Sequence, residues 1–287
     1  MSYLLDLLTQ CGIYIILCMS LNLIMGYGGM THLGHGGLFA VGAYVSALCF
    51  VHLGLPFFVE MLLAALVTTV FGLLIAFPAI RLKDDYLAFT TCGFALVIYA
   101  IANNWMKVTN GPIGIPNISY PTIFGFKFRG WYYLIIVAFF TLLIFFLIRR
   151  IVNAPFGRTI ESIREDETAS LACGRDINKI KATIFCVGAF FAGIAGTLYV
   201  HYLGIADPTS FTSTVSFTLM SMILIGGSGS LSGPIVGAAL VVLLPQLLKF
   251  LGLPNFYAEH LQNVIYSLAL IVVMLTRPQG LLGKFKF

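Results

Sequence analysis

Residues 7–59 read LLTQCGIYIILCMSLNLIMGYGGMTHLGHGGLFAVGAYVSALCFVHLGLPFFV, a run of 53 residues without Asp, Glu, Lys or Arg. A second run, 208–248, contains 41 residues and is equally free of these charges. Each run is about twice the roughly 20 residues that an α-helix needs to cross a bilayer. Neither run alternates apolar and polar residues in segments of about 10, as the strands of a transmembrane β-barrel do. The sequence therefore predicts an all-α, polytopic integral membrane protein.

The composition excludes a soluble protein. Of the 287 residues, 59% are apolar and 9% are charged, whereas a soluble domain carries about 25% charged residues. The mean hydropathy is +0.98. The net charge of +5 is small, and the basic residues lie at the ends of apolar segments. That placement indicates membrane topology, and we expect no nucleic-acid partner.

Charges, prolines and glycine clusters divide the chain into about nine apolar segments, each a candidate transmembrane helix. The segments are 3–25, 37–55, 57–80, 86–105, 131–148, 182–204, 214–226, 235–251 and 263–276. Because 214–226 and 263–276 are short, eight crossings are an alternative to nine. We expect one membrane domain over residues 1–287.

The Lys and Arg residues indicate which loops are cytoplasmic. If the C-terminus is inside, 12 of them lie in inside segments, and Lys107, Lys127 and Arg129 lie outside, with Lys249 at a helix edge. This distribution is a clear positive-inside bias. With nine crossings, the N-terminus is then outside.

The segment 149–181 is the longest polar stretch, and this orientation makes it cytoplasmic. It contains 12 of the 27 charged residues. Because Arg158 to Cys173 contains neither Gly nor Pro, we predict one amphipathic helix there, with Ile160, Ile163 and Leu171 near one face and Gly174 as its C-cap. Such a helix is either a solvated connector or an element that docks on a cytoplasmic partner.

Two glycine clusters stand out, one in each half of the chain. Seven glycines lie between Gly26 and Gly42, and five between Gly226 and Gly237. Tight turns and close helix packing explain such clusters. Alternatively, they form irregular backbone at membrane depth, beside a transport path. Under the second hypothesis, the residues of the path are Asn22, Gly34, His35, Gly36, Asn103, Gly226, Gly227 and Gly229.

Motifs for catalysis are absent from the sequence, and we expect no enzyme activity. There is no GxSxG, no HExxH and no phosphate-binding loop with its Lys, so the chain has no motif of its own for ATP hydrolysis. We interpret His32 and His35 as satisfied polar residues of a turn, and we expect no metal and no cofactor. Asn22, Asn103 and Asn104 are interpreted as buried or half-buried amides. Nearly all ionisable groups fall at segment ends, with His201 a weak exception, which argues against proton coupling.

Segment 182–204 contains a stripe of small residues. Gly188, Ala192 and Gly196 recur every four residues, with Ala189 and Gly193 alongside. A stripe of this kind allows a second helix to approach closely. We predict that it packs within this chain or against a partner subunit.

Several stretches together resemble one family, the permeases of branched-chain amino-acid ABC transporters, of the LivM type. The stretches are GYGGMTHLGHGGLFAVGAYVSAL, VTNGPIGIP, GRTIESIREDETASLACGRDINKIKATIF, FFAGIAGTLYVHYLGIADPTSF, GGSGSLSGPIVGAALVVLLP and RPQGLLG. They occur in order from about residue 20 to 283, so the resemblance covers most of the chain.

The resemblance implies a set of partners. A related second permease subunit would form a heterodimer with this chain in the bacterial inner membrane, two ATPase subunits would dock on the cytoplasmic side, and an external binding protein would deliver substrate. The helix within 149–181 would couple ATP hydrolysis to transport. The coupling residues would be Arg158, Glu161, Arg164, Glu165, Asp166, Glu167, Ala169 and Gly174. Thr168 stands where the wider permease signature has Glu.

The substrate and the class of transporter have alternatives. The family serves leucine, isoleucine and valine, and similar permeases carry urea or short amides. A stand-alone secondary transporter is a second hypothesis. A carboxylate in the middle of a predicted helix would have favoured it, and the sequence has none there. A membrane scaffold that transports nothing is a third.

Overall fold

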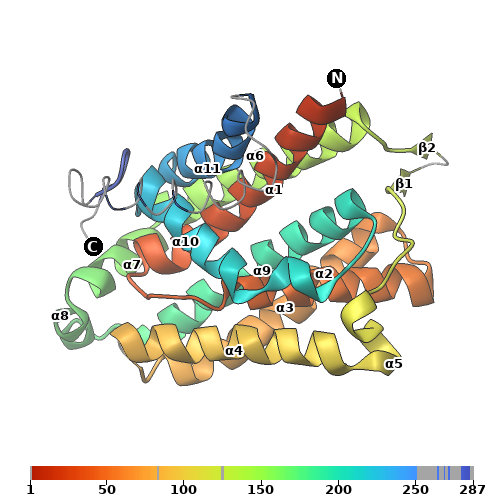
Figure 1. The fold of residues 1–287 in the computed structure, drawn as a ribbon. Coiled ribbons are helices and arrows are strands. Elements are labelled where there is room, and N and C mark those ends of the chain that lie inside the picture. Colours follow the sequence, from red (N-terminus) through yellow and green to blue (C-terminus); the bar gives the residue numbers. More distant parts are fainter. Residues whose placement is uncertain are drawn as a thin grey trace.

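The fold is described from a computed structural model, which places residues 2–82, 84–123, 126–250, 264, 268, 271 and 279–284. Helices form nearly all of it (Figure 1). The longer helices are α1 (Ser2–Asn22), α2 (His35–Leu48), α3 (Phe57–Ala79), α4 (Asp84–Asn104), α6 (Trp131–Asn153), α7 (Pro155–Glu165), α9 (Ile177–Leu203), α10 (Ser213–Gly226) and α11 (Gly233–Phe250). The short elements are η1 (Leu23–Tyr27), η2 (Cys49–Leu53), α5 (Met106–Thr109), η3 (Gly111–Ile113), β1 (Thr122–Ile123), β2 (Phe126–Lys127), α8 (Glu167–Ala172) and η4 (Pro208–Phe211).

The chain is a polytopic membrane protein. In the described part of the chain, six helices are long and apolar enough to cross a bilayer: Tyr3–Tyr27, His35–Leu53, Phe57–Pro78, Asp85–Asn104, Trp131–Asn153 and Ile177–Leu203. The predicted segments 214–226 and 235–251 coincide with α10 and α11. The predicted segment 263–276 lies outside the described residues except for 264, 268 and 271, so eight or nine crossings stay a prediction.

Two helices extend beyond the boundaries that the charges indicated. The prediction ended one segment at 148 and began another at 182, but α6 continues to Asn153 and α9 begins at Ile177. Long basic side chains reach water from a helix that continues beneath them. Arg149, Arg150 and Lys179 therefore mark the membrane surface without ending the helix.

The basic residues separate between the two ends of the molecule. α7, α8 and the described C-terminal residues 279–284 lie at one end, which we call the basic end (Figure 1). α5, β1, β2 and the N-terminus lie at the opposite end, with Lys107 in α5 and Lys127 in β2 (Figure 1). This separation agrees with the predicted orientation, in which the basic end faces the cytoplasm.

Helix α9 packs against α2 and α3 through small residues. A Cβ atom added to Gly42 of α2 would lie 2.5 Å from the Cα atom of Gly193. A Cβ atom added to Gly193 would lie 2.7 Å from the Cα atom of Ala65 in α3. The backbones approach this closely because no side chain separates them. The predicted stripe of small residues is therefore a packing surface within this chain.

Helix α10 is too short to cross a bilayer alone, whereas α2 continues into η2 and spans His35–Leu53. The 14 residues of α10 extend over about 21 Å of a hydrocarbon core that is about 30 Å thick. Non-helical backbone precedes both, at 28–34 and at 204–212, apart from the 3-10 turn η4. The first turns of the two helices meet inside the protein, where the Gly36 N–H donates to Ser216 Oγ at 3.0 Å.

Candidate functional site at the basic end

The predicted cytoplasmic helix is two helices. α7 begins at Pro155, whose missing N–H is tolerated in a first turn, and ends at Glu165. Asp166 is extended, and its Oδ1 accepts hydrogen bonds from the backbone N–H groups of Thr168 (2.9 Å) and Ala169 (3.0 Å). The prediction of one helix from 158 to 173 was wrong because Asp is a strong N-cap and starts a new helix, α8. Hydrogen bonds from the Thr168 side chain and the Ala169 backbone also lower the pKa of Asp166.

The predicted C-cap at Gly174 is confirmed. Gly174 has a φ of 73°, and its N–H donates to the Leu171 carbonyl at 2.9 Å. The Arg175 N–H donates to the Ser170 carbonyl at 3.3 Å, which completes a Schellman motif. Asp176 then caps the N-terminus of α9 through the Lys179 N–H, at 3.1 Å.

The break at Asp166 gives α7 and α8 different surroundings. Ile160 and Ile163 of α7 are buried, as the sequence predicts. Leu171, which the prediction placed on the same face, is 56% exposed because α8 starts in a new direction. Glu165 and Asp166 are exposed at the corner between the helices. The corner and α8 thus present an apolar side chain and two carboxylates to solvent.

Besides Asp166, three of the predicted coupling charges have partners within the chain. Glu161 pairs with Lys284 of the C-terminal segment at 2.8 Å, and Glu167 pairs with Lys181 of α9 at 3.0 Å. The Arg164 guanidinium donates to the backbone carbonyl of Gly26, at the end of the first transmembrane helix. The structure thus turns these three side chains toward the protein itself.

The two glycine clusters meet at this end of the molecule. Asn22 joins them, because its Oδ1 accepts from the Gly229 N–H at 3.0 Å and its Nδ2 donates to the Ser230 carbonyl at 2.9 Å. A Cβ atom added to Gly26 would lie 2.6 Å from the Gly229 nitrogen. Asn22 is buried, as predicted, and it connects segments that are 207 residues apart.

The C-terminal segment completes this junction. The Leu281 N–H donates to the Ile225 carbonyl at 3.0 Å, and the Leu282 N–H donates to the Gly226 carbonyl at 2.9 Å. A Cβ atom added to Gly227 would lie 2.6 Å from the Cα atom of Gly283, and Gly227 has a φ of 110°. Only glycine tolerates both this close approach of the backbone and this positive φ.

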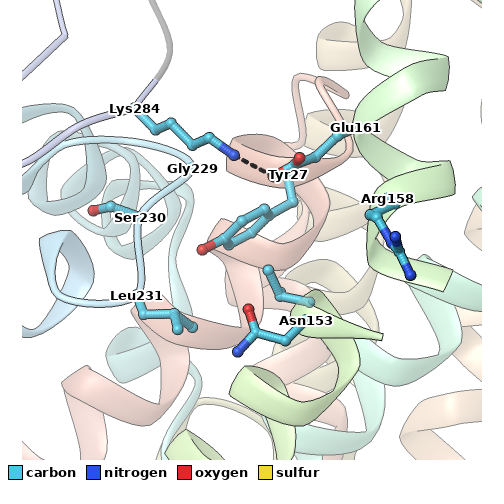
Figure 2. Close-up of a pocket in the computed structure, with 9 residues that line it drawn as sticks. Tyr27, Asn153, Arg158, Glu161, Gly229, Ser230, Leu231 and Lys284 are labelled. Atoms are coloured by element: carbon cyan, nitrogen blue, oxygen red, sulfur yellow. Dashed lines mark hydrogen bonds and ion pairs between the residues drawn. The ribbon is translucent and has the colours of Figure 1, made fainter. Parts of the chain in front are cut away.

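A hollow of about 650 Å³ opens between these segments. Its lining residues are Tyr27, Val152, Asn153, Arg158, Glu161, Gly229, Ser230, Leu231 and Lys284. Figure 2 shows Tyr27 between the turn at 229–231 and α7, with the Lys284–Glu161 ion pair on one side. The predicted coupling residues Arg158 and Glu161 and the predicted path residue Gly229 thus lie around the same hollow.

A second group of predicted path residues lies deeper, where α2 begins. Gly34 is the N-cap residue of α2, and His35 Nε2 lies 2.7 Å from Ser20 Oγ. His32 and His35 are both fully buried. Within the described residues, neither ring nitrogen of His32 has a hydrogen-bond partner, so the prediction of a satisfied side chain holds for His35 Nε2 and was wrong for His32. The His32 ring instead contacts the rings of His35 and Phe185 edge to face.

The predicted residue Asn103 does not join either group. It lies near the end of α4 at the opposite end of the molecule and is half-buried. Its neighbour Asn104 is exposed, contrary to the prediction, because α4 ends there, and its amide donates to the Ala100 carbonyl of the same helix at 2.8 Å.

Sequence reasoning missed one buried polar pair. The Oε1 atom of Glu60 lies 2.5 Å from the Nε2 atom of His201, and both side chains are fully buried. The Nδ1 atom of His201 lies 2.6 Å from the Ser119 carbonyl oxygen. The rings of Phe50 and Phe57 flank the imidazole, with centroids 5.4 Å and 5.2 Å away. Glu60 lies in the first turn of α3, as predicted, and His201, the predicted weak exception, lies in the last turn of α9. No sequence signal links positions 141 residues apart.

Comparison with known proteins identifies relatives of the chain. Residues 3–275 match the family model described as "Branched-chain amino acid transport system / permease component". The chain is 35% identical to the high-affinity branched-chain amino acid transport system permease protein LivM of Salmonella typhimurium, over 96% of this chain and 69% of that protein. It is 34% identical to LivM of Escherichia coli with the same coverage, and 27% identical to a probable LivM of Methanocaldococcus jannaschii over 95% of this chain and 91% of that protein. No solved structure matches.

Proposed function

Because the chain belongs to the family of permease components of branched-chain amino-acid transport systems, we propose that it is a membrane subunit of an ATP-driven importer for leucine, isoleucine and valine. The relatives named as LivM, at 34% and 35% identity, support this substrate class. In the proposed importer, residues 1–287 form one permease domain in the inner membrane. A second permease, two cytoplasmic ATPase subunits and an external binding protein complete the importer.

The observation that carries the proposal is the shape of the α7–α8 corner. This corner extends from the basic end, and it exposes Leu171 together with the carboxylates of Glu165 and Asp166. An apolar side chain beside charges suits a groove on another protein. The exposed residues Thr168 and Ala169 belong to the same surface. We infer that this surface docks on an ATPase subunit and that the basic end is cytoplasmic.

The irregular backbone supports a transport role. Polar backbone groups are tolerated within a bilayer only where protein or a water-filled path covers them. The segments 28–34 and 204–212 lead into the meeting point of α2 and α10, where Gly36 bonds to Ser216. We infer that the substrate path passes beside this point and beside Asn22, Gly34, His35, Gly226, Gly227 and Gly229, with Asn103 near its outer mouth.

Purification of the chain from its native membrane in mild detergent, followed by mass spectrometry, tests the proposed assembly. We expect two ATPase subunits and a second permease to co-purify, and the reconstituted complex to take up radiolabelled leucine when ATP is supplied. A chain that purifies alone and carries leucine down an ion gradient would contradict the proposal.

Paired substitutions test the docking surface. Glu165→Lys combined with Asp166→Lys should abolish ATP-dependent uptake while the protein remains in the membrane, because the charge of the corner is reversed. Lys179→Ala is the matched control, since this cation is also exposed near the basic end but lies outside the corner. Equal uptake by the double variant and the control would remove Glu165 and Asp166 from docking.

A further inference from the structure

We propose that Arg164 is a positioning residue that makes α7 and the two glycine-rich breaks, at 26–29 and at 226–230, move as one body. The proposal rests on the function proposed above. Its side chain leaves α7 and donates to the Gly26 carbonyl in η1. Arg164 is half-buried, so this contact is shielded from water in part. The residue is thus turned toward the membrane domain and away from the exposed corner.

The acceptor is a carbonyl that helix geometry leaves without a partner. η1 ends at Tyr27, and the last carbonyls of a helix have no intrahelical donor. The C-terminus of a helix also carries partial negative charge, which favours a cation there. The guanidinium of Arg164 supplies both the donor and the charge. A residue of the cytoplasmic helix therefore caps the broken end of the first transmembrane helix.

The stem of the Arg164 side chain determines a second feature of the break. A Cβ atom added to Gly29 would lie 2.7 Å from the Cγ atom of Arg164. Gly29 also has a φ of 65°, a conformation that suits glycine. The backbone after η1 thus packs directly on the Arg164 side chain, which makes the contact one of shape as well as charge.

Further contacts continue from η1 to the second break and return to α7. Asn22 precedes Gly26 by one helical turn and binds Gly229 and Ser230. The segment 225–228 pairs with the C-terminal residues 281–284, and Lys284 pairs with Glu161 of α7. These contacts form a closed ring, and its members Glu161, Gly229, Ser230 and Lys284 line the hollow of Figure 2.

The two links of α7 in this ring differ in strength. The Lys284–Glu161 pair is exposed, with side-chain exposures of 58% and 25%, and exposed ion pairs contribute little. The Arg164 bond is charge-assisted, caps a helix end and is half-buried, so it is the stronger link. Loss of Arg164 should therefore leave α7 docked on the ATPase, but a displacement of α7 would no longer move the two glycine-rich breaks.

The first test measures leucine uptake per ATP hydrolysed by the complete complex in proteoliposomes. We expect Arg164→Ala to keep its ATPase subunits and its ATP hydrolysis but to lower this ratio about tenfold, within the usual range for coupling between sites. Arg164→Lys should recover part of the loss, because Lys donates to a carbonyl but has a shorter reach. Lys179→Ala, the exposed control, should keep the wild-type ratio.

A double variant distinguishes a shared link from separate effects. If Arg164 acts through Gly26 and Asn22, the variant carrying both Arg164→Ala and Asn22→Ala should lose no more than the worse single variant. Losses that multiply would overturn the proposal, as would an unchanged ratio in Arg164→Ala. Failure of the ATPase subunits to co-purify with Arg164→Ala would assign the residue to docking. Absence of both Arg164→Ala and Arg164→Lys from the membrane would assign it to stability.

A distance measurement tests the same proposal without any substrate. Spin labels at Pro155→Cys, which is exposed at the start of α7, and at Ser232→Cys, in a background where Cys92, Cys173 and Cys186 are Ser, should give one narrow distance distribution with and without ATP. Arg164→Ala should broaden it, and an unchanged distribution would overturn the proposal. A wild-type complex that takes up no leucine, isoleucine or valine would contradict the proposed substrate, but the distance result would still decide the role of Arg164.

Discussion

The Glu60–His201 pair allows a prediction with a worked magnitude. The Ser119 carbonyl can only accept a hydrogen bond, so the Nδ1 atom of His201 carries a hydrogen. The Nε2 atom of His201 then faces the Oε1 atom of Glu60, 2.5 Å away. Removal of either side chain leaves a fully buried polar group without its partner.

The variants differ in the group that they leave behind. His201→Leu leaves a buried carboxyl group without its partner, and breaking a buried ion pair costs about 3–5 kcal/mol. Glu60→Leu leaves only an imidazole nitrogen unpaired, and an unsatisfied buried polar group costs about 1–3 kcal/mol. In the double variant, leucines replace both groups, and an apolar replacement of a buried pair is often neutral or stabilising. We therefore expect the double variant to be more stable than His201→Leu alone.

Equilibrium unfolding in mixed micelles of dodecyl maltoside and SDS measures these free energies. Glu60→Gln is the matched control, because its amide can still donate to a neutral imidazole, and it should lose less than about 1 kcal/mol. If the losses of the two single variants add in the double variant, the two side chains do not interact, and the reasoning is refuted.

Two further predictions concern the α7–α8 corner and the α9 packing surface. Asp166→Ala should shorten α8, whereas Asp166→Asn should keep its length, because Asn caps a helix without charge. Circular dichroism of a peptide covering 155–176 checks this. Hydrogen bonds from Thr168 and Ala169 lower the pKa of Asp166, so their contribution to stability is present at neutral pH and is lost as the pH falls through that lowered pKa. The same peptide should therefore lose helix on acidification, whereas the Asp166→Asn peptide should not. Gly193→Leu should destabilise the protein by about 3 kcal/mol, because overpacking a close contact costs about 1–3 kcal/mol and here the neighbours are backbone atoms. Gly93→Ala, where a Cβ atom would meet nothing within 4 Å, should be neutral or slightly stabilising. Thermal unfolding followed by size-exclusion chromatography compares the two variants, and equal stability would contradict this packing.

Parts of several stretches of sequence that resemble the family lie together at the basic end, near the hollow. The stretches that resemble the family include both glycine clusters, the cytoplasmic loop and the C-terminal RPQGLLG. These stretches are far apart in the chain, yet they contact one another through Asn22, Arg164 and the backbone bonds of Leu281 and Leu282. A motif such as RPQGLLG therefore has a packing reason, because Gly280 and Gly283 fit against Gly227.

Some features could be predicted from the sequence because their causes are local. The apolar segment between Pro56 and Arg81 predicted a helix over 57–80, and the observed helix α3 is Phe57–Ala79. Gly174 ends α8 with the expected positive φ, since only the residue itself decides whether a left-handed conformation is tolerated. The family was also predicted, since its motifs are read directly along the chain.

Other features depended on neighbours that are distant in sequence, and only the tertiary structure decided them. The sequence indicated Arg164 as a charge on a docking helix, but the nearby end of η1 turns its guanidinium to Gly26. It indicated Glu60 at a segment end and His201 as a weak exception late in another segment, but the packing of α3 on α9 places them 2.5 Å apart. Local propensity and hydropathy act over a few residues, so they determine which segments are helices and where each one ends. The partner of a polar side chain depends on which helices pack together, and that is decided by the whole fold.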